Sequence, residues 1–337
     1  MTEHDTPAPV TLLQMMTGYW VSQSVYVAAK LGIADLVADG GKTSEELAQS
    51  TGAPAPSLYR LLRGLASVGV FTDIGDGRFA LTPLATLLRT DLPGSMRALA
   101  ITYCEEQYRA WGDLLHSVQT GETAFNHAFG TGFFEYVAQH SRSSAIFNDA
   151  MTSWSTQVAA AVVAAYDFSG ISRIVDVGGG HGTIIAAILQ AQPAMRGVLF
   201  DLPHVVGGAK ERLEAAGIAD RCETVGGDFF EAVPSGGDAY VLAQILHDWD
   251  DARCMAILKQ CHRAMTEQAK LLVVELVLPP GNDQFFGKLL DLHMLVMAGG
   301  RERTADEYRT LFASAGFRLT SITPTPAGAS VIEGMRL

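Results

Sequence analysis

Apolar residues occupy nearly every face of the segment 11–37, which predicts a helix that is buried on all sides. The segment lies near the start of the chain, where the simplest partner for such a helix is a second copy of the protein. We therefore expect a homodimer in which these N-terminal helices form the interface. The alternative is that the helix packs within its own chain.

The next region combines two helical patterns with a hairpin pattern. Thr43 or Ser44 can cap a first helix, which carries acids in its first turn and ends at Gly52. A second helix over 56–69 places leucines on one face: Leu58, Leu61, Leu62 and Leu65. The segment 70–82 has GDG at its centre and predicts a two-stranded hairpin.

Two helices followed by a hairpin form the outline of a winged helix. DNA binding by such a fold would require a basic face. The arginines of this region are balanced by acids, namely Arg60, Arg63, Arg78 and Arg89 against Glu45, Glu46, Asp73 and Asp76. This balance favours a structural or dimerisation role over DNA binding.

Residues 95–168 show helical patterns with many large aromatic side chains. Phe147, Met151 and Trp154 fall on one helical face, because they are four and three residues apart. This face has two interpretations: an ordinary core, or the wall of a pocket for a flat aromatic ligand. The spacing alone favours the core.

From residue 171 onward, short β-rich runs alternate with helical segments. The runs are RIVDV, GVLFDLP, CETVGGD, DAYVLAQIL and AKLLVVELVLP, and the helical segments include 182–192, 205–217 and 251–265. Apolar strands that alternate with helices predict a parallel sheet covered by helices, which is an α/β fold. The final runs RLTSITPTP and ASVIEGMRL predict an antiparallel pair.

The composition narrows the possible functions. The chain has 337 residues, of which 48% are hydrophobic and 18% are charged, and its net charge is −12. An acidic chain is poorly suited to sequence-independent binding of nucleic acid, which requires Lys and Arg contacts to phosphate. No apolar run is long enough to span a membrane, and the N-terminal MTEHDTPAP lacks the pattern of a secretory signal.

The cysteines point to a reducing compartment. They are Cys104, Cys222, Cys254 and Cys261, and they form no CxxC pair and no zinc spacing. We therefore expect free thiols, a cytoplasmic protein and no metal site.

The run IVDVGGGHG follows a predicted strand and precedes a predicted helix, and its glycines allow a ligand to approach the backbone closely. The run does not match the dinucleotide pattern GxGxxG. Counted from Gly178 or Gly180, the position of the third glycine holds Thr183 or Ile185. The Lys of a phosphate-binding P-loop is also missing. A loop without a grip on pyrophosphate suits S-adenosylmethionine.

Two acids and an aromatic residue follow the next strands. Asp201 ends the second strand, where a carboxylate can accept hydrogen bonds from both hydroxyls of a ribose. Asp228 follows the third strand and can accept from an adenine amino group, with Phe229 on the adenine face. Each acid alone is also consistent with a solvated strand end. Ligands of open α/β sheets, however, bind at the ends of successive strands.

Together these motifs carry a family resemblance over nearly the whole chain. VDVGGGHG, DLPHVV, GDFFEAVPSGGDAYVLAQILHDWDD and GGRERT resemble the small-molecule O-methyltransferases of plant phenolic and bacterial antibiotic pathways. Within that family, LLQMMTGYWVSQSVYVAAKLGIADLV and YCEEQYRAWGDLLHSV are most similar to phenazine methyltransferases.

The resemblance implies an α/β fold with three parts. Residues 1–95 would form an N-terminal all-helical winged-helix dimerisation domain, and residues 96–168 a helical linker that contributes to the substrate pocket. Residues 169–337 would form a Rossmann-like domain with a mostly parallel seven-stranded sheet. This domain would bind S-adenosyl-L-methionine, with S-adenosyl-L-homocysteine as the product.

The resemblance also assigns roles to single residues. His247 matches the family's general base, and Glu275 and Glu302 match two acids that flank and orient it. The residues expected to contact S-adenosylmethionine are Gly178, Gly180, Asp201, Asp228, Phe229 and Gln244. The residues expected to line the acceptor pocket are Phe147, Met151, Trp154, Asp291, Met294 and Met297. Many relatives carry a Lys four residues before the base, but this chain has Ala243 there.

A histidine base can remove the proton of the acceptor, which such a reaction requires. A phenol with a pKa of about 10 is only about one part in a thousand ionised at pH 7, so forming the phenolate costs roughly 4 kcal/mol. A positioned His can remove the proton, and two carboxylates nearby would favour the imidazolium and fix its tautomer. His247 beside Asp248 is also consistent with a helix cap, but Glu275 and Glu302 favour the base.

We therefore expect an enzyme that methylates a phenolic hydroxyl, or an N-hydroxy oxygen, of a planar tricyclic aromatic compound such as a hydroxyphenazine. One alternative is methylation of a ring nitrogen, which needs no base because nitrogen has a free lone pair. Another is methylation of a different polycyclic phenol. A ligand-binding winged-helix regulator is the non-enzymatic alternative, and the balance of charges speaks against it.

Overall fold

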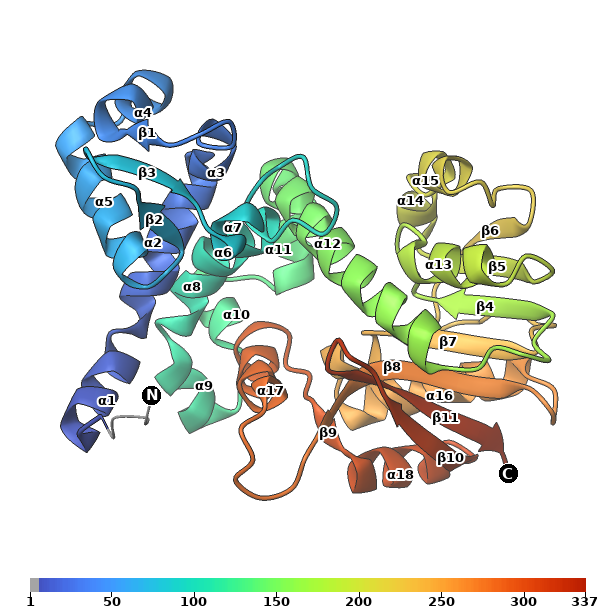
Figure 1. Cartoon of the computed structure of the whole chain (residues 1–337). Coiled ribbons are helices and arrows are strands. Elements are labelled where there is room, and N and C mark those ends of the chain that lie inside the picture. Colours follow the sequence, from blue (N-terminus) through green and yellow to red (C-terminus); the bar gives the residue numbers. More distant parts are fainter. Residues whose placement is uncertain (1–5) are drawn as a thin grey trace. The chain divides into compact units, whose positions relative to one another are not determined.

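The computed structural model describes residues 6–337, so the first five residues of the N-terminal stretch lie outside the described part (Figure 1). The chain forms two compact units. The N-terminal unit extends to Arg109 and includes Val137–Ser153, and the sheet unit comprises Ala110–Tyr136 and Trp154–Leu337. The predicted middle segment 96–168 is thus shared between both units. The three-part division of the chain stays a prediction.

The N-terminal unit begins with α1 (Ala8–Met16), α2 (Gly18–Lys30) and α3 (Ile33–Leu36). The continuous helix predicted over 11–37 is therefore wrong. The backbone leaves helical geometry at Thr17, with φ −98° and ψ 5°, and again at Gly32, whose φ of 66° is left-handed and favours glycine. Large apolar side chains are exposed on α1 and at the start of α2: Leu12, Leu13, Met15, Met16, Tyr19 and Trp20.

The winged-helix elements follow as the sequence pattern predicts. They are β1 (Lys42–Thr43), α4 (Ser44–Thr51), α5 (Ala55–Ser67), β2 (Phe71–Asp73) and β3 (Arg78–Leu81). Thr43 caps α4 in a capping box with Glu46, and Gly52 ends the helix in a left-handed conformation. β2 and β3 form the predicted hairpin, and β1 adds a third strand in the order β1-β3-β2. The region is thus helical apart from this small sheet.

Further helices connect the wing to the large sheet. They are α6 (Pro83–Thr86), α7 (Arg97–Cys104), α8 (Glu106–Trp111), α9 (Leu114–Thr120), α10 (Ala124–Phe129), α11 (Phe133–Gln139) and α12 (Ser141–Ala165). α8 and α12 each contain residues of both units. No helix among residues 6–337 combines the length and the hydropathy needed to cross a bilayer.

The sheet unit is built on a seven-stranded sheet with one short extra strand. Its strands are β4 (Arg173–Val177), β5 (Arg196–Asp201), β6 (Cys222–Gly226), β7 (Ala239–Ala243), β8 (Lys270–Leu278), β9 (Arg303–Thr304), β10 (Phe317–Pro324) and β11 (Ala329–Arg336). The order is β10-β11-β8-β7-β4-β5-β6, and β9 pairs with β8. β4 to β8 pair in parallel, whereas β10 and β11 are antiparallel, which confirms the predicted fold.

Alternate residues of the strands face two separate cores. Ile174 and Leu199 pack with α12, α13 (Thr183–Ala191) and α15 (Lys210–Ala215) on one face. Val175 and Val198 pack with α16 (Asp251–Ala264) and α18 (Ala305–Ser314) on the other. The sheet is therefore buried on both faces, as its continuous apolar runs predict.

The two remaining helices are α14 (Pro203–Val206) and α17 (Phe286–Met297). One helix predicted over 205–217 is wrong, because α14 and α15 are separate helices. Gly207 and Gly208 lie at the start of the connection between them, where the absence of side chains lowers the preference for a continuous helix.

Leu62→Ala should lower the free energy of unfolding of the N-terminal unit by about 2–5 kcal/mol, because removing a fully buried leucine leaves a cavity. Leu61→Ala, on the same helix, truncates a side chain that is only half-buried and should cost less. Urea denaturation followed by circular dichroism would compare the two variants. Equal losses would contradict the assigned core.

Candidate active site

The carboxyl ends of four neighbouring strands carry residues predicted to bind S-adenosylmethionine. Gly178 follows β4, Asp201 ends β5, Asp228 follows β6 and Gln244 follows β7. The chain proceeds from β4 outwards to β6 and then returns to β7 on the other side of β4. Open parallel sheets bind their ligands at such a reversal of strand order.

The glycine loop lies close to the elements around it. Gly178 has a left-handed φ of 73°, and a β-carbon there would come within 2.6 Å of Ile245 and 3.4 Å of Phe229. Gly180 has a φ of 57° and donates its backbone N–H to Oδ2 of Asp201 at 2.8 Å. The loop after β4 is therefore tied to the end of β5 and reaches the residues that follow β6 and β7.

The two acids at the strand ends are half-buried and keep capacity to bind a ligand. Oδ1 of Asp201 accepts the N–H of Leu202 at 2.7 Å, and Oδ1 of Asp228 accepts the N–H of Phe230 at 2.8 Å. Each carboxylate oxygen can accept two hydrogen bonds. Both groups can therefore also accept hydrogen bonds from hydroxyl or amino groups of a nucleoside.

Asp176 lies beneath the glycine loop and was not predicted as a site residue. It is buried, neither of its oxygens makes a well-formed hydrogen bond within the described residues, and a β-carbon at Gly179 would sit 2.5 Å from its carboxyl group. Burial and the nearby charge of Asp201 raise the pKa of Asp176 to about 7, against a smaller opposing effect of the Ile185 amide. Two acids in one low-dielectric place favour a cationic ligand, so these residues fit a sulfonium cofactor.

Gln244 has an unusual backbone conformation. Its φ of 57° is left-handed, which costs a residue other than glycine about 1–3 kcal/mol. Its N–H donates to the carbonyl oxygen of Val274 at 3.0 Å and so extends the pairing of β7 with β8. Backbone strain of this kind gathers at functional sites, and the role of Gln244 in cofactor binding stays a prediction.

His247 lies on the short 3₁₀ helix η1 (Leu246–Asp248), just after β7. Its Nδ1 is 2.8 Å from Oε1 of the buried Glu302, and its Nε2 is 3.6 Å from Oδ1 of Asp248. A carboxylate only accepts hydrogen bonds, so Nδ1 carries the proton. Nε2 is then the atom of neutral His247 that can take up a proton.

Glu275 acts on the backbone and does not bond to the imidazole. Its Oε1 accepts the three consecutive N–H groups of residues 245–247, at 3.1, 2.6 and 3.1 Å, and its Oε2 accepts the hydroxyl of Tyr308 at 2.6 Å. This carboxylate therefore fixes the start of η1. The structure brings both predicted acids to His247, but only Glu302 bonds to the ring.

The electrostatics around His247 favour its protonated form. Burial alone would lower the pKa of this histidine, but the charges of Asp248, Glu302 and Glu275 outweigh burial and raise the pKa to about 10. The three acids thus make neutral His247 a much stronger base than free imidazole.

A second histidine in this unit was not predicted. Trp111 donates its Nε1–H to Nδ1 of His293 at 2.9 Å, which places the proton of the neutral imidazole on Nε2. Burial and the charge of His247 lower the pKa of His293 to about 4, so this ring stays neutral. The two partners are 182 positions apart in the sequence, which explains why no local pattern indicated the pair.

The residues predicted to line the acceptor pocket differ in their hydrogen bonds and in their burial. Oδ1 of Asp291 accepts the N–H of Glu302 at 2.9 Å, so this acid orients the partner of the imidazole. Met294 and Met297 are buried on α17, and Phe147, Met151 and Trp154 are half-buried along α12. Their contact with an acceptor stays a prediction. Residues 6–337 contain no group of three His, Cys, Asp or Glu side chains arranged to hold a metal ion.

A doubly covered, mostly parallel sheet with a glycine loop, acids at successive strand ends and a carboxylate-bound histidine defines a Rossmann-like methyltransferase. The sequence matches the O-methyltransferase dimerisation domain over residues 13–91 and the O-methyltransferase domain over residues 111–318. The chain belongs to the S-adenosylmethionine-dependent O-methyltransferase family.

Individual relatives support this assignment. The chain is 58% identical over 337 residues, 99% of either protein, to the phenazine O-methyltransferase PhzM of Lysobacter antibioticus. The crystal structure of LaPhzM matches with a TM-score of 0.94 and 57% identity, over 98% of this chain and 100% of that one.

A third match has small molecules bound. It is the O-methyltransferase NcsB1 from neocarzinostatin biosynthesis, in complex with S-adenosyl-L-homocysteine and 1,4-dihydroxy-2-naphthoic acid. It matches with a TM-score of 0.80 and 35% identity, over 94% of this chain and 96% of that one. The predicted enzyme class and its cofactor are confirmed.

Glu302→Gln keeps the shape of the side chain but removes the charge at Nδ1. The pKa of His247 should therefore fall from about 10 towards its ordinary value of 6.5. NMR titration of the imidazole would measure the shift, and the spectrum of His247→Asn would assign the signal. An unchanged pKa would show that Glu302 does not act on the ring.

The raised pKa of His247 also makes the free energy of unfolding depend on pH. Protonated His247 stabilises the folded state fully below about pH 6.5, and this contribution disappears as the pH rises through about 10. The wild-type protein should lose more stability over this interval than Glu302→Gln. Thermal denaturation across the interval tests this, and parallel curves for the two proteins would contradict it.

Gly300→Ala should disturb the loop that carries His247. A β-carbon at this position would overlap the carbonyl oxygen of His247 and the backbone of Asp248, which cannot move aside as a flexible side chain can. Methyl transfer should fall by about 10-fold or more, because small displacements of reacting groups are costly. Gly132→Ala is the control, since its added carbon would meet no atom within 4 Å apart from those of residue 132 and its two neighbours in the chain. Rates for both variants test this, and a fully active Gly300→Ala would refute it.

Proposed function

We propose that this enzyme methylates a phenolic hydroxyl of a hydroxyphenazine, with His247 as the general base. The observation that carries the proposal is the imidazole of His247, whose Nδ1 is bound to Glu302 and whose Nε2 can take up a proton. The similarity to the phenazine O-methyltransferase PhzM over the whole chain supports the substrate class. An N-hydroxy oxygen of the same ring system needs the same removal of a proton.

The carboxylates around His247 match its basicity to that of a phenol. Bound S-adenosylmethionine supplies an electrophilic methyl group, so the chain must supply a deprotonated acceptor. An ordinary imidazole is a weaker base than a phenolate by about 3.5 pKa units, or roughly 5 kcal/mol. A His247 with a pKa of about 10 closes this gap for the transfer itself, once the imidazole has lost its own proton to solvent.

We also propose which residues hold the cofactor. Gly178 and Gly180 let it approach the backbone, and Gln244 lies beside it. Asp201 accepts the ribose hydroxyls, Asp228 accepts the adenine amino group, and Phe229 lies against the adenine face. Asp176, whose pKa is raised to about 7, adds negative charge beneath the glycine loop when it is ionised. Since Ala243 replaces the Lys of many relatives, the backbone and the acids carry more of the binding here.

The remaining proposals concern the acceptor pocket and the assembly. The residues that we propose to contact the aromatic acceptor are Phe147, Met151, Trp154, Asp291, Met294 and Met297. Two copies associate through their N-terminal helices, which is supported by the dimerisation domain over residues 13–91 and by the exposed apolar side chains of α1. The four cysteines are free thiols, which suits a cytoplasmic enzyme.

The first test incubates the purified protein with S-adenosylmethionine and a panel of hydroxylated planar aromatic compounds that includes hydroxyphenazines. Mass spectrometry and NMR identify the methylated atom. A methyl group on a phenazine oxygen is expected. Methylation of a ring nitrogen would remove the stated role of His247, and methylation of other phenols alone would refute the phenazine assignment.

His247→Ala should lower kcat by about 10²- to 10⁴-fold with little change in the affinity for S-adenosylmethionine, because only proton removal is lost. The rate of the wild-type enzyme should rise with pH above neutrality, since protonated His247 must lose its proton before it can act. Rate profiles and calorimetric binding measure both effects. Nearly full activity of His247→Ala would contradict the base role.

A further inference from the structure

Arg303 follows Glu302 in the chain and is fully buried. A buried guanidinium needs partners for its charge and for its five N–H groups. Arginine side chains lie mostly at the protein surface, so the full burial of Arg303 indicates a specific role.

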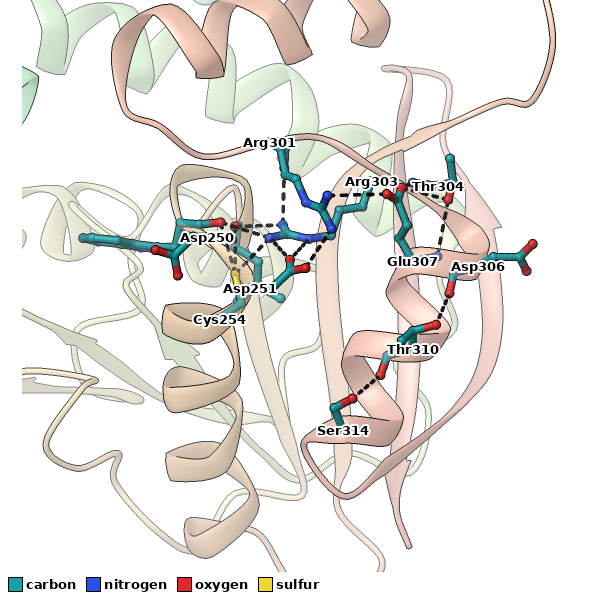
Figure 2. A network of polar contacts seen from close by, with 12 residues as sticks. Asp250, Asp251, Cys254, Arg301, Arg303, Thr304, Asp306, Glu307, Thr310 and Ser314 are labelled. Carbon is teal, nitrogen blue, oxygen red and sulfur yellow. Dashed lines mark hydrogen bonds and ion pairs between the residues drawn. The ribbon is translucent and has the colours of Figure 1, made fainter. Parts of the chain in front are cut away.

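The partners of Arg303 lie on the segment that carries His247 and on the start of α16. Nη1 donates to the carbonyl oxygen of Leu246 at 3.0 Å, and Nη2 donates to that of Trp249 at 3.0 Å. Nε and Nη2 both donate to Oδ1 of Asp251, at 3.1 and 2.9 Å (Figure 2). One side chain thus binds the backbone on both sides of residues 247 and 248.

Glu275 accepts hydrogen bonds from this segment, whereas Arg303 donates hydrogen bonds to it. The carboxylate of Glu275 binds the N–H groups of residues 245–247, and the guanidinium of Arg303 binds carbonyl oxygens of the same turn. Glu302, which precedes Arg303, bonds to the ring of His247. The position of Glu302 relative to the imidazole therefore depends on where Arg303 is fixed.

We propose that Arg303 is a positioning residue for methyl transfer: it holds the turn of residues 246–249 so that the imidazole of His247 stays aligned with Glu302. The proposal rests on the base role of His247 given under the proposed function. A lysine could not replace this arginine, because its ammonium is a single point and cannot span two carbonyl groups and a carboxylate.

The test compares Arg303→Lys with Arg301→Lys. Arg301 also bonds to Asp251, at 2.8 Å, but it is partly exposed and makes no side-chain bond to the turn. Arg303→Lys should lower kcat by about 10- to 100-fold, with little change in the KM for S-adenosylmethionine. Arg301→Lys should keep the wild-type kcat.

Two readouts separate positioning from general stability. In Arg303→Lys, the His247 pKa measured by NMR should fall towards its ordinary value, and the amides of residues 245–247 should exchange with deuterium faster. Both should stay unchanged in Arg301→Lys. An Arg303→Lys enzyme with wild-type kcat and titration would overturn the proposal.

If Arg303→Lys does not fold, Asp251→Asn tests the positioning role of Arg303 instead. This variant keeps the guanidinium but removes its charged partner, and it should change kcat and the His247 titration in the same direction by a smaller factor. Wild-type values for both would overturn the proposal. His247→Ala is measured alongside. Full activity of that variant refutes the base role, whereas the titration and exchange data report on Arg303 independently.

Discussion

The catalytic segment depends on one buried carboxylate. The strand β7 ends at Ala243, and the chain then turns into η1, where three consecutive backbone N–H groups point at Oε1 of Glu275. Buried amides without partners would be costly, so the fold places a charge-assisted acceptor on the neighbouring strand β8. Tyr308 satisfies the second oxygen. The position of His247 therefore follows from an interaction that its own side chain does not make.

The parallel strands were predictable because their physical causes are local. RIVDV coincides with β4, since a strand buried on both faces reads as an apolar run and the glycines after it end the run. The capping box of α4 and the hairpin turn were visible for similar reasons. The break at Thr17 was missed although Gly18 follows it, because apolar residues continue on both sides and suggested an unbroken helix.

The types of residue at the site were predictable from the sequence, but the contacts between them were not. The family resemblance indicated His247 and two flanking acids, but not that Glu302 bonds to the ring while Glu275 binds the backbone. Arg303 escaped notice because charged residues are expected at the surface. The bond between Trp111 and His293 joins distant parts of the chain, and only the folded structure reveals it.

The acids beneath the glycine loop bear on turnover as well as on binding. Burial and the charge of Asp201 raise the pKa of Asp176 to about 7, and a sulfonium bound at the glycine loop would favour the ionised form of Asp176. Methyl transfer converts that sulfonium into a neutral thioether, so the attraction weakens once the reaction has occurred. The same two carboxyl groups should therefore bind S-adenosylmethionine more strongly than S-adenosylhomocysteine, which limits product inhibition without a conformational change.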